Sequence, residues 1–324
     1  MPNPLPSHSV PMSESAADSK CVAILLCTYN GGSFLKQQLD SIAAQSHQQW
    51  VVCASDDGST DETLEILRHY REVWGHDRLL ISQGPQRGFT NNFLSVLGQA
   101  SGHFGYYAFC DQDDYWHPTK LQRALDWLDH QPATMPSLYC SRTRTVDENG
   151  NCVGLSPLFS KRPSFENALM QSLAGGNTMV INQSACSLID ATPANTPLVC
   201  HDWWAYLLIT GCGGHVYYDP TPSLDYRQHA HNVIGANTSM TNRLFRLKRM
   251  FQGALKEWNA KNIAALTLVA AHLTPSNLKK LERFESARRA SLGKRVGLMI
   301  SGRFYRQTLM GNLGLALAVC LRRI

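Results

Sequence analysis

Apolar runs of strand length alternate with segments of helical spacing over the first 135 residues. The runs cover residues 21–28, 50–54, 79–82 and 106–110. A run that is apolar on both faces is typical of a strand buried inside a parallel sheet. The pattern therefore predicts four buried strands in this part of the chain.

The segments between these runs carry apolar residues three and four positions apart, which indicates helices. The helical positions are Leu35, Leu39 and Ile42, then Leu64 and Leu67, then residues 89–99, then Leu121, Leu125 and Leu128. We expect Ser33 to cap the first helix. Ser59 and Glu62 have the spacing of a capping box at the start of the second helix.

Strand alternating with helix predicts an α/β fold with a doubly wound, mostly parallel sheet flanked by helices. Ligands of such sheets bind at the carboxyl ends of the strands. Polar clusters follow three of the apolar runs, at residues 28–30, 56–57 and 111–114. We therefore expect these clusters to meet at one edge of the sheet.

Beyond residue 135 the alternation of strand and helix is less regular. We expect strands near Leu138 and Met179, a helix from about Trp203 and a strand at 216–218. Helical spacing returns near the end, on both sides of Pro275. We divide the chain into a Pro- and Ser-rich leader, an α/β domain and a helical C-terminal region, at residues 1–20, 21–238 and 239–324. The leader is expected to be disordered.

Composition favours a protein of a reducing compartment. Hydrophobic residues make up 44% of the 324 positions, enough for a sizeable core. The ten cysteines show no Cys-x-x-Cys pair, and several lie inside apolar runs. This usage argues against a disulfide framework. No charged-then-apolar signal peptide opens the sequence, so we expect a cytoplasmic location.

The net charge of +5 hides a division between the two ends of the chain. Residues 240–324 carry 17 Lys and Arg against three Glu, a formal charge of +14, whereas residues 1–239 carry 13 basic and 22 acidic side chains, or −9. A basic region with an apolar end at 313–321 favours peripheral binding to an anionic membrane surface. Nucleic acid is the less favoured partner, because the region has few aromatic side chains to stack on bases. No run reaches the ~20 apolar residues that span a bilayer.

Three carboxylates, those of Asp111, Asp113 and Asp114, follow the strand at 106–110 within four residues. They repel one another unless they are solvated or share a cation. Asp111 and Asp113 can point the same way from extended chain, and a hard divalent ion takes oxygen ligands that a diphosphate would complete. The alternative is a plain polar loop after a strand.

The neighbouring clusters suit a nucleotide. The carboxylates of Asp56 and Asp57 can accept hydrogen bonds from a base or a ribose, the Tyr29 ring can stack on a base, and Arg87 can pair with a phosphate. The alternatives are a helix-entry turn at Asp56-Asp57-Gly58-Ser59 and an ordinary surface arginine at Arg87.

Five motifs in order resemble the family 2 glycosyltransferases of the GT-A fold over residues 21–236. They are Leu26-Cys27-Thr28-Tyr29-Asn30-Gly31, Ser55-Asp56-Asp57-Gly58-Ser59, Phe109-Cys110-Asp111-Gln112-Asp113-Asp114, His201-Asp202-Trp203-Trp204 and Tyr226-Arg227-Gln228-His229. The last two are similar to the bacterial rhamnosyltransferase-like branch. Members of the family often have Glu-Asp where this chain has His201-Asp202, which fits that branch better than the general family.

The resemblance implies roles for named side chains. It implies that Asp111 and Asp113 hold Mg²⁺ or Mn²⁺ against the donor diphosphate and that Asp202 is the catalytic base. The residues expected to bind the nucleotide are Thr28, Tyr29, Asn30, Asp56, Asp57, Arg87 and Asp111. The alternative for Asp202 is the N-cap of the helix that follows it.

The residues expected to contact the donor or acceptor sugar are Asp114, Asn177, Trp203, Trp204 and Arg227. Trp203 and Trp204 equally suit the core, although sugar rings do stack on indoles. For His229 two interpretations stay open. It is either a contact to the metal or diphosphate, or a partly buried histidine that donates to a backbone carbonyl.

The resemblance implies an inverting, metal-dependent transferase that moves a sugar, rhamnose from dTDP-rhamnose, to a hydroxyl of a surface polysaccharide or lipid-linked glycan. The expected location is peripheral, at the cytoplasmic face of the cell membrane. A sugar-nucleotide pyrophosphorylase is one alternative, but Tyr29-Asn30-Gly31-Gly32 lacks the arginine of its loop. An Asp-x-Asp phosphatase is disfavoured by Tyr115, and a non-catalytic nucleotide-sugar-binding protein would need no base at Asp202.

Overall fold

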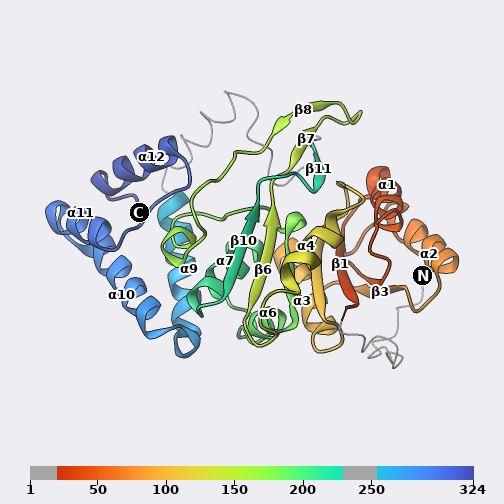
Figure 1. Cartoon of the computed structure of the whole chain (residues 1–324), viewed down its shortest axis with the longest axis horizontal. Helices are drawn as coiled ribbons and strands as arrows, with labels where there is room; N and C mark the ends of the chain where they lie inside the picture. The colour runs from red at the N-terminus through yellow and green to blue at the C-terminus, as the bar shows by residue number, and fades with distance from the viewer. Residues whose placement is uncertain (1–19, 229–253) are drawn as a thin grey trace.

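The computed structural model describes residues 20–228 and 254–324 (Figure 1). Apart from Lys20, the leader lies outside the described residues, as do His229 and the segment up to residue 253.

A seven-stranded sheet forms the centre of the α/β domain, with the strand order β10-β6-β9-β4-β1-β2-β3. Neighbours are parallel except β9, which runs antiparallel to β4 and β6. The mostly parallel, doubly wound sheet expected from the sequence is confirmed. The strands are β1 (Val22–Thr28), β2 (Trp50–Asp56), β3 (Leu79–Gln83), β4 (Tyr106–Asp111), β6 (Ser137–Ser141), β9 (Val180–Asn182) and β10 (His215–Asp219).

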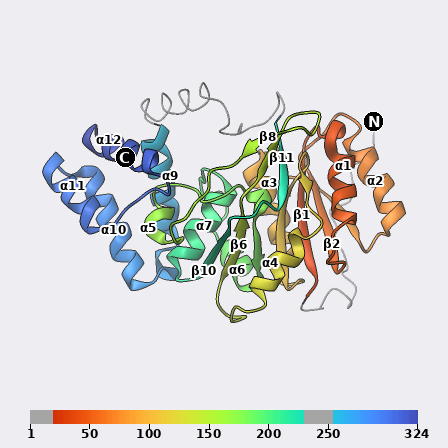
Figure 2. The ribbon, with the colours of Figure 1, turned by 45° about the horizontal axis from the view of Figure 1, so that its top comes forward.

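Both faces of this sheet are buried because its central strands are apolar on both sides. In β1, Ala23 and Leu25 belong to one core, and Ile24 and Leu26 belong to the other. The first core includes side chains of α3 (Phe89–Ala100), α6 (Gln183–Asp190) and α7 (His201–Gly211). The second includes side chains of α1 (Gly32–Ala43), α2 (Thr63–Trp74) and α4 (Lys120–Leu128). Figures 1 and 2 show these helices on either side of the strands.

A second, four-stranded sheet lies beyond the carboxyl ends of the central strands (Figure 1). Its order is β5-β11-β7-β8, from β5 (Tyr115–Trp116), β11 (Leu224–Arg227), β7 (Arg144–Val146) and β8 (Cys152–Leu155). The sequence pattern did not predict it, because its strands are two to four residues long and come from distant segments.

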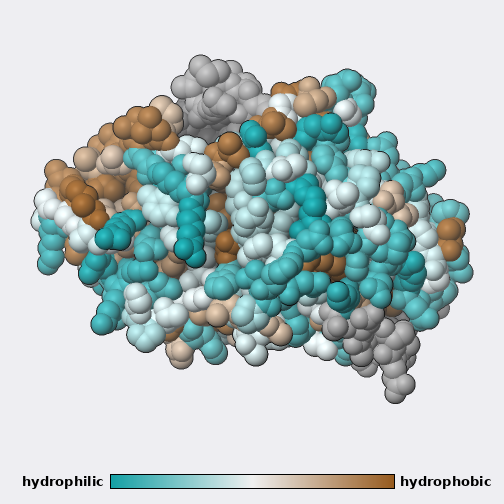
Figure 3. Space-filling model, in the orientation of Figure 1, coloured by the Kyte–Doolittle hydropathy of each residue, from teal (hydrophilic) through white to brown (hydrophobic). Residues whose placement is uncertain are grey.

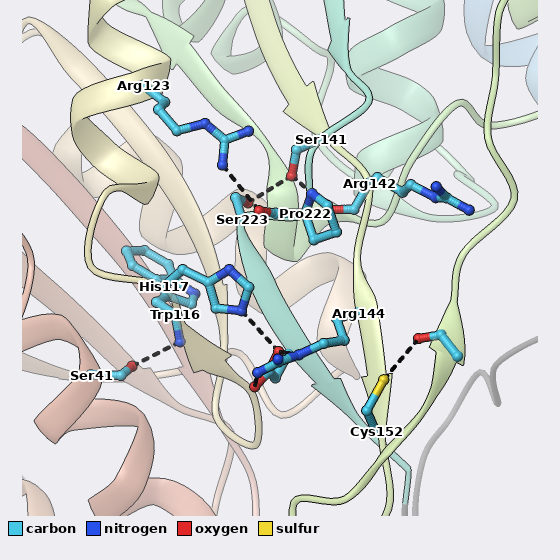
Figure 4. A network of polar contacts seen from close by, with 12 residues as sticks. Ser41, Trp116, His117, Arg123, Ser141, Arg142, Arg144, Cys152, Pro222 and Ser223 are labelled. Atoms are coloured by element: carbon cyan, nitrogen blue, oxygen red, sulfur yellow. Dashed lines mark hydrogen bonds and ion pairs between the residues drawn. The ribbon is translucent and has the colours of Figure 1, made fainter.

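Polar contacts hold the small sheet together (Figure 4). His117 Nε2 lies 2.8 Å from Asp225 Oδ1, and the Arg144 guanidinium donates to both oxygens of the same carboxylate at 2.6 and 2.5 Å. Burial alone would raise the pKa of Asp225, but these two partners outweigh it and lower the pKa to about 2. Ser141 and Ser223 lie 2.6 Å apart between the two sheets. The carboxylate of Asp225 in β11 therefore joins β7 to the residue that directly follows β5.

Two predicted helix caps are wrong. The N-cap of α1 is Gly31, not Ser33, and the N-cap of α2 is Glu62. The Ser59 hydroxyl donates instead to Asp56 Oδ2 at 2.6 Å. The same hydroxyl oxygen accepts from the backbone nitrogen of Asn30 at 2.8 Å, so Ser59 serves the loop rather than the helix.

The C-terminal region is helical, as predicted, and Pro275 occupies the first position of its second long helix. Its elements are α9 (Ala254–Leu268), η3 (Ala270–His272), α10 (Pro275–Arg289), α11 (Leu292–Ser301) and α12 (Leu309–Cys320). Among the described residues, no helix is long and apolar enough to cross a membrane.

The C-terminal helices are fastened to the α/β domain by buried polar contacts. Asn277 Nδ2 donates to the carbonyls of Thr210 and Gly211 at 2.9 and 3.0 Å, at the end of α7. Lys280 Nζ lies 2.8 Å from a carboxylate oxygen of Glu166, in α5 (Phe165–Ala168). These contacts fix α10 rigidly on the domain.

Candidate active site

The strand register brings the three polar clusters to one edge of the main sheet. Thr28 at the end of β1 lies opposite Asp56 at the end of β2. One residue earlier, Cys27 lies opposite Asp111 at the end of β4. The carboxyl ends of three adjacent parallel strands therefore meet, as the doubly wound topology requires.

Asp56 is the main connector between the first two loops. It accepts hydrogen bonds from Thr28 Oγ1 at 2.8 Å and from the backbone nitrogens of Gly58 and Ser59. Asn30 adds a second link, since its backbone nitrogen donates to Ser59 Oγ at 2.8 Å. Asp56 is buried, and both of its oxygens hold protein groups. Its visible role is to shape the loop.

Asp57 organises the next loop along the chain. Its carboxylate accepts from the backbone nitrogens of Gln86 at 2.6 Å and Gly88 at 3.0 Å. This loop carries Arg87, whose exposed guanidinium donates to Asn195 Oδ1 at 2.8 Å. Asp57 thus sets the position of Arg87 at the rim of the site.

Tyr29 presents its ring to solvent at the same edge, with 59% of its surface exposed. Its backbone is clamped by Gln112, whose side chain accepts from Tyr29 N at 2.9 Å and donates to Tyr29 O at 3.0 Å. A side chain at Gly31 would collide with Gln112, because a Cβ there would come within 2.1 Å of Gln112 Oε1. The aromatic face and the acidic loop are therefore held in fixed relation.

Asp111, Asp113 and Asp202 share one electrostatic environment. Burial, together with the charges of Asp113 and Asp202, raises the pKa of Asp111 to about 7 against the opposing effect of Lys120. Carboxylates so placed require a compensating cation to be ionised together.

Asp111 and Asp113 suit a divalent cation by their chemistry. Within residues 20–228 and 254–324, no three His, Cys, Asp or Glu side chains form a group able to hold a metal ion unaided. Two hard carboxylate ligands leave several positions for other oxygens, as Mg²⁺ commonly has when it bridges protein and phosphate. The residues present fit a metal whose coordination is completed by a diphosphate.

Asp114 and Asn177 lie behind this cluster rather than at its surface. Asp114 is 1% exposed and accepts from Asn177 Nδ2 at 2.5 Å, while its other oxygen is buried without a hydrogen-bond partner. Burial and the charges of Asp113 and Asp111 raise the pKa of Asp114. Both residues were expected to contact sugar, and the structure gives them no open face for it.

Lys120 is the buried cation of this region, and the sequence interpretation missed it. Its Nζ donates to Asn177 O at 2.8 Å and lies 4.5 Å from the centre of the Trp116 ring. Burial lowers the pKa of Lys120 to about 8, although Cys110 and Asp114 act in the opposite direction. A lysine at the first position of a helix opposes the helix dipole. That unfavourable position was the available signal that Lys120 has other partners.

Asp202 lies in the first turn of α7, and the N-cap of this helix is Cys200. The N-cap alternative for Asp202 is therefore wrong. Its Oδ1 accepts from Trp203 N at 2.6 Å, and the free amides of the first turn stabilise its negative charge.

The aromatic contacts of the His201 ring hold the start of α7 in place. Its ring stacks on Phe93 with centroids 4.0 Å apart and meets Phe109 edge-on at 5.0 Å. Burial lowers the pKa of His201 to about 4, so the imidazole is neutral at pH 7. Gly176 leaves space for this ring, because a Cβ at that position would lie 2.4 Å from His201 Nε2. A neutral ring at this position adds no positive charge beside Asp202, so His201 does not serve as its countercharge.

Trp203 and Trp204 are core residues. Both are buried; Trp203 Nε1 donates to Ala168 O at 2.7 Å and Trp204 Nε1 to Thr192 Oγ1 at 2.9 Å. Neither indole has an open face on which a sugar ring could stack, which favours the core alternative for both.

Arg227 supports the acidic loop from the small sheet. Its guanidinium donates to the carbonyls of Asp113 at 3.3 Å and Glu148 at 2.9 Å, and to Gln37 Oε1 at 2.6 Å. The end of β11 therefore holds the backbone that presents Asp113. The two interpretations of His229 remain open, because that residue is outside the described part.

Comparisons with known proteins point to one family. The family model described as glycosyl transferase family 2 matches residues 23–187. The chain is 28% identical over 229 residues to the dTDP-rhamnosyl transferase RfbG of Shigella flexneri, over 68% of this chain and 78% of RfbG. It is 30% identical over 216 residues to an uncharacterized protein of Mycobacterium tuberculosis, over 65% of this chain and 60% of that protein.

Solved structures share the fold. The crystal structure of S. aureus TarS 1-349 in complex with UDP has a TM-score of 0.54 and 17% identity, and covers 93% of this chain and 90% of that one. The complex of the same protein with UDP-GlcNAc gives a TM-score of 0.51 at 16% identity, covering 87% and 90% of the two chains. This likeness shows the GT-A fold.

Proposed function

The chain belongs to glycosyl transferase family 2 and is a glycosyltransferase that uses a nucleotide sugar donor, and from this premise we propose an inverting, metal-dependent transfer of rhamnose from dTDP-rhamnose to a glycan hydroxyl. The pyrophosphorylase, the phosphatase and the non-catalytic binding protein are thereby set aside. The proposed parts are the donor sugar, the metal, the stereochemistry and the role of each side chain.

One observation carries the proposal for the site. The register of β1, β2 and β4 aligns Thr28, Asp56 and Asp111 at one edge, and Asp202 lies near enough to raise the pKa of Asp111. In our proposal, Asp202 is the base, and it would stand beside the carboxylates that face the leaving diphosphate. This arrangement supports a single displacement between the two groups.

In the proposed reaction, Asp202 accepts the proton of the acceptor hydroxyl as that oxygen bonds to the anomeric carbon. The diphosphate leaves from the opposite face of the sugar, so the configuration inverts. Asp111 and Asp113 would hold Mg²⁺ or Mn²⁺, whose charge offsets the negative charge that builds on the diphosphate. Lys120 and Arg227 act indirectly, by balancing the charge of the acidic loop and holding its backbone.

For the nucleotide, we propose that the exposed Tyr29 ring stacks on the base and that Arg87 meets a phosphate. In our proposal the loops shaped by Thr28, Asn30, Asp56 and Asp57 form the rest of the nucleotide pocket. The choice of dTDP-rhamnose is supported by the name of the relative from Shigella flexneri.

We further propose that the acceptor is a growing surface polysaccharide or a lipid-linked glycan, and that the enzyme works at the cytoplasmic face of the membrane. The excess of positive charge in residues 240–324 supports attraction to anionic lipid.

A thermal-shift panel tests the donor. Purified protein is mixed with dTDP-rhamnose, UDP-glucose, GDP-mannose and their free nucleotides, with Mn²⁺ or with a chelator. We expect the largest rise in melting temperature with dTDP-rhamnose and Mn²⁺ together, because ligands that bind only the folded state stabilise it. Equal shifts for all three donors would contradict the choice of rhamnose, and equal shifts with chelator would contradict the metal.

A further inference from the structure

The outer faces of α11 and α12 are apolar although they are exposed. On α12 the exposed side chains include Leu309, Met310, Leu313 and Leu317, and Leu309 is 77% exposed. On α11, Leu292 and Ile300 are exposed at the ends of a stripe with four-residue spacing. Figure 3 shows the hydrophobic colour gathered over these two helices. Contiguous apolar surface of this kind marks a docking face.

This face is not a frayed end of the chain. The buried Arg295 of α11 donates to the carbonyl of Val319 in α12 and to that of Ala290, both at 2.7 Å. Ahead of α12, Gln307 Nε2 donates to Lys161 O at 3.1 Å and to Asn167 Oδ1 at 3.2 Å. The apolar face is therefore fixed in orientation relative to the α/β domain.

The charge around this face has one sign. Residues 286–324 carry eight Lys and Arg and no Asp or Glu. Of the basic side chains, Lys294, Arg303, Arg322 and Arg323 are exposed, as is Arg289, which pairs with Glu285. Apolar side chains on a segment whose charged residues are all cations are complementary to an anionic lipid interface, where each cation adds about 1 kcal/mol of attraction.

A second exposed apolar group lies on the small sheet. Val153 and Leu155 of β8 and the nearby Leu158 are exposed, and β8 is an edge strand of that sheet. Figures 1 and 2 show β8 and α12 along the same upper side of the molecule. The opposite edge strand of the sheet, β5, directly follows Asp114 of the acidic loop.

We propose that α11, α12 and β8 form a two-part surface that docks on an anionic bilayer and turns the acidic loop toward the lipid headgroups. The helices lie in the interface, since α12 has 12 residues and is too short to span the bilayer. Only the purpose of this surface rests on the proposed function: docking would bring the active site to a lipid-linked acceptor. The lipid binding itself requires neither nucleotide nor metal.

Vesicle flotation tests the surface, using phosphatidylcholine alone or mixed with phosphatidylglycerol. The full chain is compared with the variant Leu309→Asn/Leu313→Asn/Leu317→Asn and with Val153→Asn/Leu155→Asn. The matched control is Val73→Asn, which changes a side chain that is 66% exposed on α2. Melting temperatures confirm that each variant is folded.

We expect the full chain and the control to float with the phosphatidylglycerol vesicles and to be released by salt. The triple variant should bind at least about tenfold more weakly, since it loses three exposed leucines that the lipid interface would bury. The β8 variant should bind more weakly than the control. Wild-type flotation by the triple variant, or equal flotation on both kinds of vesicle, overturns the proposal.

Two further measurements separate the possible failures. Light scattering on the full chain and the triple variant overturns the proposal if the substitutions convert a dimer to a monomer, because the face would then join two copies of the chain. Nucleotide binding is measured without lipid in all variants. A chain that floats but binds no nucleotide contradicts only the proposed function, whereas one that binds nucleotide but does not float contradicts only the docking surface.

Discussion

The α/β domain and the C-terminal helices use charge in opposite ways. The domain gathers carboxylates at the carboxyl ends of its strands, where Asp111 and Asp114 lie around the buried Lys120. The C-terminal region, apart from the buried Arg295, keeps most of its cations at the surface and has apolar side chains on both its inner and outer faces. Bringing like charges together costs free energy, so the carboxylates are grouped only where the chemistry requires them. A surface that binds an anionic bilayer requires only apolar area and positive charge.

We expect the largest effect when Lys120, the buried cation of the α/β domain, is removed. Lys120→Met leaves Asp111 and Asp114 without their buried countercharge. We expect the free energy of unfolding to fall by roughly 3–5 kcal/mol, as for other buried charges that lose a partner. Chemical denaturation measures the change. Lys36→Met, at an exposed position of α1, is the control. A change no larger than that of the control would show that Lys120 does not balance the acidic loop.

Asp202→Asn tests the chemistry of the same cluster. Because Cys200 is the N-cap of α7, the substitution removes a proton acceptor without removing a cap. We expect sugar transfer to fall by at least about a hundredfold, while melting temperature and donor affinity are kept. Glu65→Gln controls for the loss of a carboxylate from the first turn of a helix, here α2. Near-normal transfer by Asp202→Asn would leave the reaction without this base.

Asp113→Ala tests the metal. With the native chain, we expect nucleoside diphosphate to bind at least about tenfold more tightly with Mn²⁺ than with chelator. The variant should bind equally in the two conditions and remain folded. Isothermal titration gives both affinities, and Asp77→Ala, at an exposed position after α2, is the control. A metal effect that survives in Asp113→Ala would assign the ion to other ligands.

Asn277→Ala tests how far the two regions depend on each other. The change leaves the buried carbonyls of Thr210 and Gly211 without the Asn277 amide, which we expect to cost about 1–3 kcal/mol of stability. Transfer to a soluble acceptor should be nearly unchanged, because the contact lies at the end of α7 remote from Asp202. Asn149→Ala, at an exposed position, is the control. If transfer falls as much as in Asp202→Asn, the two regions are not separate in role.

Local pattern was enough to predict the alternation of strand and helix, the mostly parallel sheet and the edge at which the polar clusters meet. These follow from local periodicity, since a strand apolar on both faces requires helices on both sides. The family resemblance was also readable, because its motifs lie in the loops that end those strands.

Only the folded structure shows which polar side chains are accessible to a ligand and which hold other residues in place. Asp56 and Asp57 bond to neighbouring loops, Asp114 and Asn177 bond to each other, and Trp203 and Trp204 point into the core. The small sheet and the outer apolar face of α12 were equally beyond local pattern. The burial of a side chain and its hydrogen-bond partners depend on segments far apart in the chain. The residue type says which contacts a side chain can make, but the fold determines which neighbours are close enough to make them.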